Sequence, residues 1–422
     1  MRASTVAYCL LGAAAAVGLV VSARRAGPPE TAEGRRLYRF ACWGAAQELR
    51  ELKERVVGPV NAEAEDFRVE LVHIPSDYRT KLCTMIAGGT PPELFYLSQE
   101  YVATFAAQGA LLDLTELVAQ DGRGACDLKQ YYPSVLAQYR HGGRLYGLPW
   151  IAQPVVLYCN ARLFRQGGVA LPDRSWGWQK FVQAGNALTR DTDQDGRMDQ
   201  WGFIVNGWPP VRMWIWQNGA ELVDRESGLL RLTDPAVTQA VDAYAALIHR
   251  HRLAPPLSVV AEAGFAEMFR AGKVAMFMGG AADDLDRTPG LEVVVREVPA
   301  GPGGRRATFA WSAGLHVSAA VKDPRAAFAV YKKILERIHR WKIPAPRRPL
   351  AARLEEFEPR KAPAAAVIRS SMEYMRTPVG FPRQVEFDTL FQEEFEEPIL
   401  RTGRPAAELA PRAARVLERL LR

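Results

Sequence analysis

Cysteine and histidine are scarce in this chain of 422 residues, which contains only five and six of them. No cluster of the two has the spacing of a zinc site. The cysteines beyond the first thirty residues permit three disulfide pairings in an oxidising compartment, and the alternative is that all are small buried hydrophobic residues. Both interpretations stay open for Cys42, Cys83, Cys126 and Cys159.

The chain also lacks the short motifs of common catalytic sites, including G-x-S-x-G, H-E-x-x-H and the phosphate-binding loop. Carboxylates do occur close together at Asp283, Asp284 and Asp286, with Glu262 and Glu267 on a predicted helix. A glycosidase needs two such acids placed across its substrate, and nothing in this spacing requires that. We therefore predict a binding protein and no enzyme, with a carbohydrate-active enzyme as the alternative.

Long hydrophobic runs are absent except near the N-terminus, where Val6–Val21 carries no charge. Arg2 precedes this run, and Val21-Ser22-Ala23 followed by Arg24 ends it. A positive start, an apolar core and small residues at the exit are typical of a secretory signal. We predict that residues 1–25 are a signal peptide or an uncleaved signal anchor, so that the protein is exported and periplasmic or at the cell surface.

An excess of negative charge is absent too: the net charge is +7 and the pI is about 9.2. The densest basic region, from Arg337 to Lys361, also contains glutamates and has no nucleic-acid motif. We expect no nucleic-acid partner and a solvated basic face. The functional alternative is attraction to an anionic ligand or a membrane surface.

What is present is a mixed α/β pattern. Apolar runs predict strands at 37–42, 67–74, 93–97, 154–158, 201–205, 274–278 and 291–295. Helical spacing predicts helices at 47–57, 78–87, 181–189, 235–249 and 261–271. The stretch Ile74–Leu114 contains, in order, a helix, a Gly-Gly-Thr-Pro-Pro stop, a buried strand and a new helix at Ser98. A strand followed by a loop and a helix N-terminus is the unit that holds ligands in open α/β sheets.

The loop that follows residue 189 carries a candidate metal site. Asp191, Asp193, Asp195 and Asp199 stand at positions 1, 3, 5 and 9 of a calcium loop, with Gly196 at position 6 and Arg197 contributing its carbonyl. Position 12 is Gly202, where a bidentate glutamate is needed, so we expect weak binding. The alternative is an Asp-Gly turn with its carboxylates in solvent. No other cofactor is expected.

Several fragments resemble, in order, the extracellular solute-binding proteins of bacterial ABC importers, in the branch that includes the maltose- and glycerol-phosphate-binding proteins. They are DYRTKLCTMIAGGTPPELFYL, GALLDLTEL, RLYGLPWIAQPVVLYCNARLF, FAEMFRAGKVAMFMGG and AGLHVSAAVKDPRAAFAVYKKI, with Asn218-Gly219 between the third and fourth and Gly403-Arg404-Pro405 in the tail. The family usually has Asp at the position of Glu93 and often an aromatic residue at that of Cys159.

The resemblance implies an α/β, two-lobed periplasmic-binding-protein fold with mixed, mostly parallel sheets flanked by helices and a ligand cleft at the hinge. We expect an N-terminal lobe at 36–149 plus 310–344 and a C-terminal lobe at 150–309 plus 345–422. It also implies closure by hinge bending, permease subunits of an ABC transporter in the membrane as partners, and a monomer.

The resemblance further implies which residues contact the solute. Trp43, Trp208, Trp214 and Trp311 would offer broad apolar faces, as stacking on a sugar requires. Tyr78, Ser98, Gln99 and Gln153 would supply hydrogen bonds, and Gly279 and Gly280 would expose backbone N–H groups. Arg383 would clamp a phosphate or carboxylate, or else is a surface arginine. The predicted solute is a sugar or oligosaccharide; the alternatives are a phosphorylated polyol such as a glycerol phosphate, or a sensor domain without transport.

Overall fold

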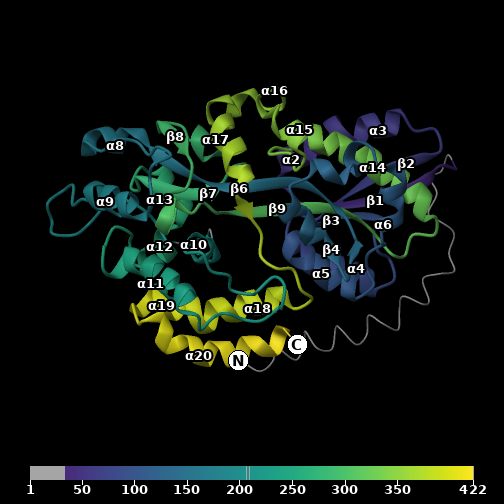
Figure 1. Cartoon of the computed structure of the whole chain (residues 1–422). Coiled ribbons are helices and arrows are strands. Elements are labelled where there is room, and N and C mark those ends of the chain that lie inside the picture. The colour runs from purple at the N-terminus through teal and green to yellow at the C-terminus, as the bar shows by residue number, and fades with distance from the viewer. Residues whose placement is uncertain (1–33, 206, 209, 422) are drawn as a thin grey trace. The chain divides into compact units, whose positions relative to one another are not determined.

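The structure is a computed structural model that describes residues 34–205, 207–208 and 210–421 (Figure 1). The predicted signal at 1–25 lies outside the described residues. The chain divides into two compact units, called unit 1 (up to Ala152, and Ser312–Leu350) and unit 2 (Gln153–Trp311 and Ala351–Arg422). The changes of unit fall after 152, 311 and 350, beside the lobe boundaries expected after 149, 309 and 344.

The sheet of unit 1 has the strand order β2-β1-β3-β9. β1 (Arg36–Cys42) pairs in parallel with both β2 (Phe67–His73) and β3 (Leu94–Ser98). β9 (Thr308–Val317) runs antiparallel to β3, with Leu94 opposite Val317 and Ser98 opposite Ala313. Phe40, Leu94 and Phe95 are buried in these strands, as expected for a sheet covered on both faces.

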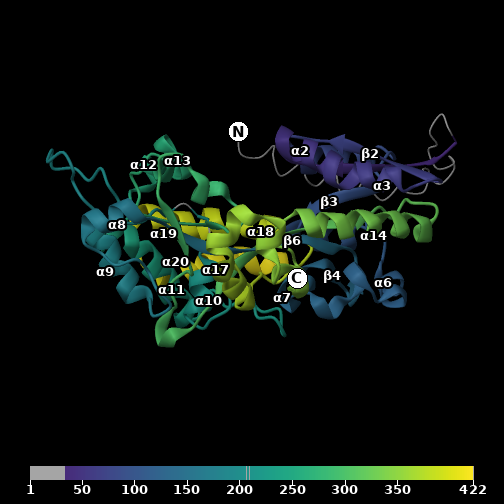
Figure 2. The same ribbon diagram turned by 90° about the horizontal axis from the view of Figure 1, so that it is seen from above.

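Helices surround this sheet. The longest is α14 (Pro324–Trp341), which is capped by the Asp323 carboxylate and contacts the π-helical turn η2 (Lys53–Val57). Figure 2 shows the length of α14. The remaining helices of unit 1 are α2 (Ala46–Leu52), α3 (Gly58–Ala62), α4 (Tyr78–Ala87), α5 (Gln99–Ala107), α6 (Thr115–Asp121) and α7 (Pro133–Leu136), with the 3-10 turns η3 (Gly124–Cys126), η4 (Leu128–Gln130) and η5 (Ala137–Tyr139) and the short hairpin β4 (Arg140–His141) and β5 (Arg144–Leu145). α15 (Arg348–Ala351) lies at the last change of unit.

The strands of unit 2 centre on the second half of β6 (Leu148–Asn160). β6 pairs antiparallel with β7 (Met276–Gly280) and with β8 (Val293–Arg296). The first residues of β9 pair in parallel with β10 (Met375–Arg376). β6 and β9 thus contribute residues to both units, and the sheets are mixed, as predicted.

One apolar core joins these strands to helices from distant parts of the sequence. α11 (Pro235–His249) packs against α19 (Glu397–Thr402) and α20 (Ala406–Leu421), and α20 also contacts α18 (Gln384–Phe391), as Figure 1 shows. The other elements are α8 (Ala161–Gly167), α9 (Trp178–Leu188), α10 (Arg212–Gln217), α12 (Leu257–Ala263), α13 (Phe265–Arg270), α16 (Leu354–Phe357) and α17 (Ala362–Glu373), with the π-helical turn η9 (Gln392–Glu396) and the 3-10 turns η6 (Asp284–Arg287), η7 (Pro302–Gly304) and η8 (Pro359–Lys361).

Most predicted elements have ends shifted by a few residues, and the strand expected at 154–158 extends over Leu148–Asn160. Three others differ in kind or continuity. The strand expected at 201–205 is wrong: Trp201 makes only an isolated bridge with Val274. The helix expected at 261–271 is two helices, because Gly264 between them has φ 77°. The helix expected at 47–57 continues through a π-helical turn to Ala62.

The four cysteines of the described part of the chain are free thiols; Cys42, Cys126 and Cys159 are buried and Cys83 is exposed. The structure thus has no disulfide among these residues. Three of the four cysteines are buried, as in the interpretation that they are small hydrophobic residues. Burial raises the pKa of the Cys42 thiol to about 12, so this thiol stays protonated.

Within the described residues, no helix combines the length and the apolar character needed to cross a bilayer.

Candidate functional site

Four aromatic side chains gather beside the carboxyl end of β1 and form what we call the aromatic group of unit 1. Trp43 follows β1, Tyr78 begins α4, Tyr96 lies in β3 and Trp150 lies in β6. The ring centroid of Trp43 is 4.9 Å from that of Tyr78, 5.2 Å from that of Tyr96 and 6.3 Å from that of Trp150. Trp43 and Tyr78 are partly exposed, whereas Tyr96 and Trp150 are each 2% exposed. The group therefore has an apolar face at the surface and buried rings behind it.

Two polar atoms of this group have no hydrogen-bond partner among the described residues: the hydroxyl of Tyr96 and the indole Nε1 of Trp150. The two rings are 4.7 Å apart between centroids. Burial raises the pKa of Tyr96 well above its usual range, so the hydroxyl remains a neutral donor. A buried polar group without a partner costs free energy, and a ligand hydroxyl or a water molecule would remove that cost.

Tyr78 differs from the expectation that its hydroxyl binds solute. The hydroxyl lies 3.0 Å from the carbonyl oxygens of both Ala41 and Tyr96, so its single hydrogen is used to join β1 to β3. Only its ring remains available for contact.

Ser98 and Gln99 are also engaged within unit 1. The Ser98 hydroxyl donates to Glu100. Gln99 is 3% exposed, and its Oε1 accepts from the Ser312 hydroxyl at 2.9 Å, which in turn accepts from the Tyr139 hydroxyl at 3.0 Å. The Gln99 oxygen thus belongs to a buried hydrogen-bond chain, and contact of Gln99 with solute stays a prediction.

Unit 2 carries its own aromatic group, consisting of Trp208, Trp216 and Phe309. The Phe309 ring meets Trp208 edge-on at 5.1 Å and stacks on Trp216 at 6.1 Å, measured between ring centroids. Trp208 is partly buried against the unit 2 core, as is the predicted site residue Trp311 at the end of the unit 2 portion of β9. Trp208 and Trp311 thus retain partly exposed rings, as solute contact requires.

Arg376 and Glu221 border this second group. The Arg376 guanidinium lies 5.3 Å from the Trp216 ring centroid and pairs with Glu221. Glu221 also accepts from Trp216 Nε1 at 2.9 Å. Burial lowers the pKa of Arg376, and the adjacent carboxylate opposes that effect. Arg225 pairs with the same carboxylate at 3.4 Å, so two guanidinium groups share Glu221 beside these rings.

Gln153, Gly279 and Gly280 lie together in unit 2. The side-chain oxygen of Gln153 and the N–H of Gly280 already form hydrogen bonds within this unit. Gln153 Oε1 accepts from the Ala282 N–H at 3.0 Å, and the Gly280 N–H donates to Asp283 Oδ2 at 2.9 Å. A Cβ on Gly280 would lie 2.5 Å from Gln153 Oε1, so glycine lets the Gln153 side chain pack closely here. The Gly280 N–H is thus used within unit 2, and its contact with solute stays a prediction.

Trp214 is a core residue. It is 1% exposed, and its ring centroid lies 4.8 Å from that of Trp178 and 5.4 Å from that of Tyr244. Neighbouring core rings occupy the space around it, and its stacking on solute stays a prediction.

Arg383 lies at the start of α18 with half of its side chain exposed. It pairs with Glu386 at 2.8 Å, one turn along the helix. Its charge is matched by this carboxylate, as in the surface-arginine alternative, and the anion clamp stays a prediction.

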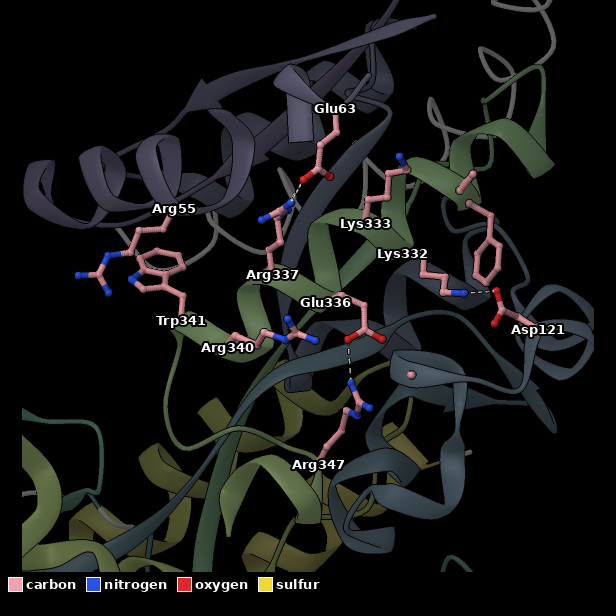
Figure 3. Close-up of a pocket in the computed structure, with 13 residues that line it drawn as sticks. Arg55, Glu63, Asp121, Lys332, Lys333, Glu336, Arg337, Arg340, Trp341 and Arg347 are labelled. Carbon is pink, nitrogen blue, oxygen red and sulfur yellow. Dashed lines mark hydrogen bonds and ion pairs between the residues drawn. The ribbon is translucent and has the colours of Figure 1, made fainter. Parts of the chain in front are cut away.

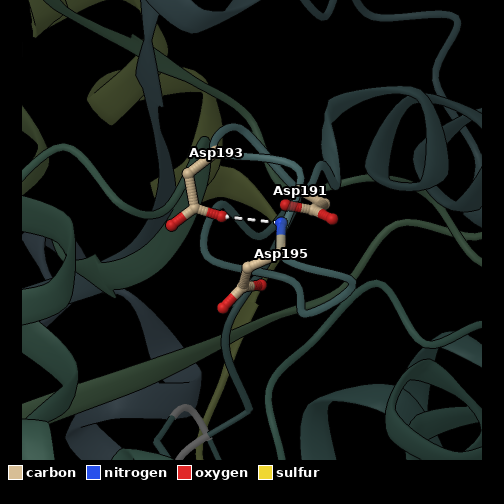
Figure 4. A group of neighbouring side chains, drawn as sticks. All are labelled: Asp191, Asp193 and Asp195. Carbon is tan, nitrogen blue, oxygen red and sulfur yellow. Dashed lines mark hydrogen bonds between the residues drawn. The ribbon is translucent and has the colours of Figure 1, made fainter.

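The acidic loop brings three of its predicted metal ligands together (Figure 4). Asp191, Asp193 and Asp195 each offer a carboxylate oxygen within 4.8 Å of the others. Asp199 is used differently: it accepts from the Thr192 N–H at 2.9 Å and from the Thr192 hydroxyl, and these bonds lower its pKa. Arg197 donates its N–H to Asp195 at 2.8 Å. The carboxylate oxygens suit calcium, and the same bonds also suit a plain Asx turn.

The acids considered for a glycosidase have structural partners. Asp286 pairs at 2.7 Å with Lys361, whose ammonium is 2% exposed, and Asp283 binds the Gly280 N–H. These carboxylates therefore have partners within unit 2, and the pairing at Asp286 joins η6 to Lys361 of η8.

Sequence reasoning missed Tyr96, Trp150 and Arg376 as candidate site residues. Trp150 follows a Gly-Leu-Pro turn, which is a signal for an aromatic residue outside a periodic core. Tyr96 gave no such signal, because the run Leu94–Ser98 reads as a buried strand whichever of its side chains reaches a site.

Residues 47–336 match the sequence model of a family described as bacterial extracellular solute-binding proteins. The chain belongs to this family. A binding protein of Brucella abortus (strain 2308) is 26% identical over 239 residues, which are 54% of this chain and 54% of that protein. The chain spans about half the length of such curated relatives.

Solved structures agree with this family. An ABC substrate-binding protein of Listeria monocytogenes, in complex with cycloalternan, has a TM-score of 0.77 and 21% identity and covers 91% of this chain and 98% of its own. UgpB of Mycobacterium tuberculosis, in complex with glycerophosphocholine, has a TM-score of 0.72 and 22% identity over 90% of this chain and 98% of its own. These likenesses confirm the predicted α/β fold of the periplasmic-binding-protein class.

Proposed function

We propose that this protein is exported, binds a sugar or oligosaccharide, and delivers it to the permease subunits of an ABC importer. Membership of the solute-binding family supports the class of function. The observation that carries the choice of solute is the aromatic group of unit 1, where an apolar face covers a tyrosine hydroxyl and an indole N–H that lack partners among the described residues.

A sugar matches this combination because its ring has an apolar face and its rim carries hydroxyl groups. Stacking on Trp43 would bury the apolar face of the sugar ring. Tyr96 Oη and Trp150 Nε1 would form hydrogen bonds with its hydroxyl groups. The structure of UgpB contains glycerophosphocholine, so phosphorylated polyols are the alternative solutes that a binding experiment should include.

Calorimetric titration of the full chain with sugars, oligosaccharides and glycerol phosphates tests the proposal. A sugar should bind, and Tyr96→Phe should weaken it by up to about tenfold, the equivalent of one hydrogen bond. Tyr331→Phe, which removes a hydroxyl from a buried tyrosine of α14, is the matched control and should leave the affinity unchanged. Binding of only the phosphorylated polyols, or equal effects of the two variants, would refute the sugar site in unit 1.

Delivery is tested separately with the cognate permease reconstituted in vesicles. The protein should stimulate ATP hydrolysis by that permease, and more so when solute is present. A protein that binds sugar but never stimulates the permease would instead support a sensor domain without transport.

A further inference from the structure

A groove of about 810 Å³ lies on unit 1 along α14, bordered by η2 and by residues next to α3, α6 and η3 (Figure 3). Its lining is rich in cations: Arg55, Lys332, Lys333, Arg337, Arg340 and Arg347. Glu63, Asp121 and Glu336 are the acidic residues of the same lining, so cations exceed carboxylates by three.

Each of these three carboxylates is already paired. Glu63 binds Arg337, Asp121 binds Lys332 at 2.5 Å, and Glu336 binds Arg347 at 3.0 Å. Glu336 also accepts the Ala125 N–H through its other oxygen, and a Cβ on Gly124 would lie 2.0 Å from that oxygen. The acids are therefore fixed in place and their charges matched, which leaves none for the remaining cations.

Those cations are Arg55, Lys333 and Arg340. All three are exposed, and none forms an ion pair within 4 Å in the described part of the chain. Lys333 lies 5.8 Å from the centroid of the Phe67 ring, and Arg55 interacts electrostatically with Glu51 one turn earlier. A bound anion would give these exposed cations a direct counter-charge.

The lining favours a small anion over a segment of protein. Protein interfaces are built around aromatic anchors that become buried at their centre. Trp341 is the aromatic side chain of this lining that is partly exposed, and its indole N–H already donates to Glu51 at 3.0 Å. Phe328 is buried. Guanidinium groups, in contrast, match the oxygen geometry of phosphate.

We infer that this groove on unit 1 binds a ligand that carries phosphate groups, with Arg55, Lys333 and Arg340 as its cationic contacts. Lys333 and Arg340 lie seven residues apart, or about 10 Å along the helix, so the site suits a ligand with more than one charged oxygen group. The phosphate belongs either to a soluble compound or to the headgroup of an anionic lipid, since both offer the same oxygens.

The test uses the full chain and the triple variant Arg55→Gln, Lys333→Gln, Arg340→Gln. Calorimetry with inorganic pyrophosphate probes the soluble source, and sedimentation with phosphatidylglycerol–phosphatidylcholine vesicles probes the lipid source. Wild type should bind at least one probe, and the triple variant should bind it at least about tenfold more weakly. Pyrophosphate binding alone identifies a soluble ligand, and vesicle binding alone identifies a headgroup.

The matched control is Arg68→Gln, Arg140→Gln, Lys273→Gln, which removes three exposed cations outside the groove and the same net charge. It should bind both probes like wild type, and both triple variants should keep the solute affinity of wild type, so the solute site and the groove are judged independently. The inference is overturned if the two triple variants lose binding equally, if wild type binds neither probe, or if a hexaglutamate peptide binds more tightly than pyrophosphate.

Discussion

Trp43 and Trp214 show how differently two tryptophans with similar sequence surroundings can be used. Both stand near turns, and the resemblance to the family assigned both to the solute. Trp43 is partly exposed at the carboxyl end of β1, while Trp214 is enclosed by Trp178, Phe181 and Tyr244. Exposure separates a residue that can stack on a ligand from one that fills a core.

We expect the alanine variants of these two residues to fail in opposite ways. Trp214→Ala should lower the free energy of unfolding by about 3–5 kcal/mol, because it opens a cavity in the core of unit 2. Trp43→Ala should lower it less and should weaken sugar binding instead. Urea unfolding and calorimetry measure the two effects. A Trp214→Ala protein with wild-type stability would contradict the burial described here.

At the scale of the element, the segment η9 carries a buried carboxyl group. Glu396 is 7% exposed, and burial raises its pKa to about 7, although the nearby guanidinium of Arg212 opposes the shift. Arg212 itself pairs with Asp388 of α18 at 2.5 Å. One oxygen of Glu396 has no partner among the described residues.

This carboxyl group should make stability fall as pH rises. The unfolded chain releases the Glu396 proton near the ordinary value of 4.5, whereas the folded protein holds it until the pH approaches 7. Folding therefore binds a proton in that window, and stability decreases through it by a few kcal/mol. Glu396→Gln should remove this part of the dependence. Urea midpoints across the window measure it, and equal slopes for variant and wild type would show that the group titrates normally.

The acidic loop between α9 and α10 is the second element with a testable property. We propose that Asp191, Asp193 and Asp195 bind calcium weakly, because position 12 of the loop is Gly202 and supplies no carboxylate. Titration of calcium into chelator-treated protein should release or absorb heat and raise the melting temperature.

Asp193→Asn should reduce that response, and Asp224→Asn, in another exposed turn, is its control. A titration without heat or thermal shift would favour the plain turn.

The predictions were most accurate where local chemistry alone decides an element. The helices at 78–87 and 235–249 have the expected bounds, because glycines follow the first and Pro235 begins the second. The expected strand at 201–205 failed because strand formation needs a partner, which the sequence does not display. The hydrogen bond of Gln99 could not be predicted for a similar reason, because its partner Ser312 is remote in sequence.

For the whole molecule, the free thiols have a direct consequence. Since the four cysteines of the described residues form no disulfide, dithiothreitol should leave the melting temperature unchanged. A native disulfide would contribute about 2–5 kcal/mol, and its reduction would be obvious in a thermal scan. A fall in melting temperature on reduction would mean that the thiols pair in the exported protein.

The three changes of unit along the chain also constrain how the protein is made. The sheet of unit 1 takes its fourth strand from residues after Ser312, so it stays incomplete until most of the polypeptide has been synthesised. Neither unit is encoded by one continuous stretch of gene. A fragment that ends before Ser312 would therefore lack part of both units, and neither half can complete its sheet and core as the chain first emerges.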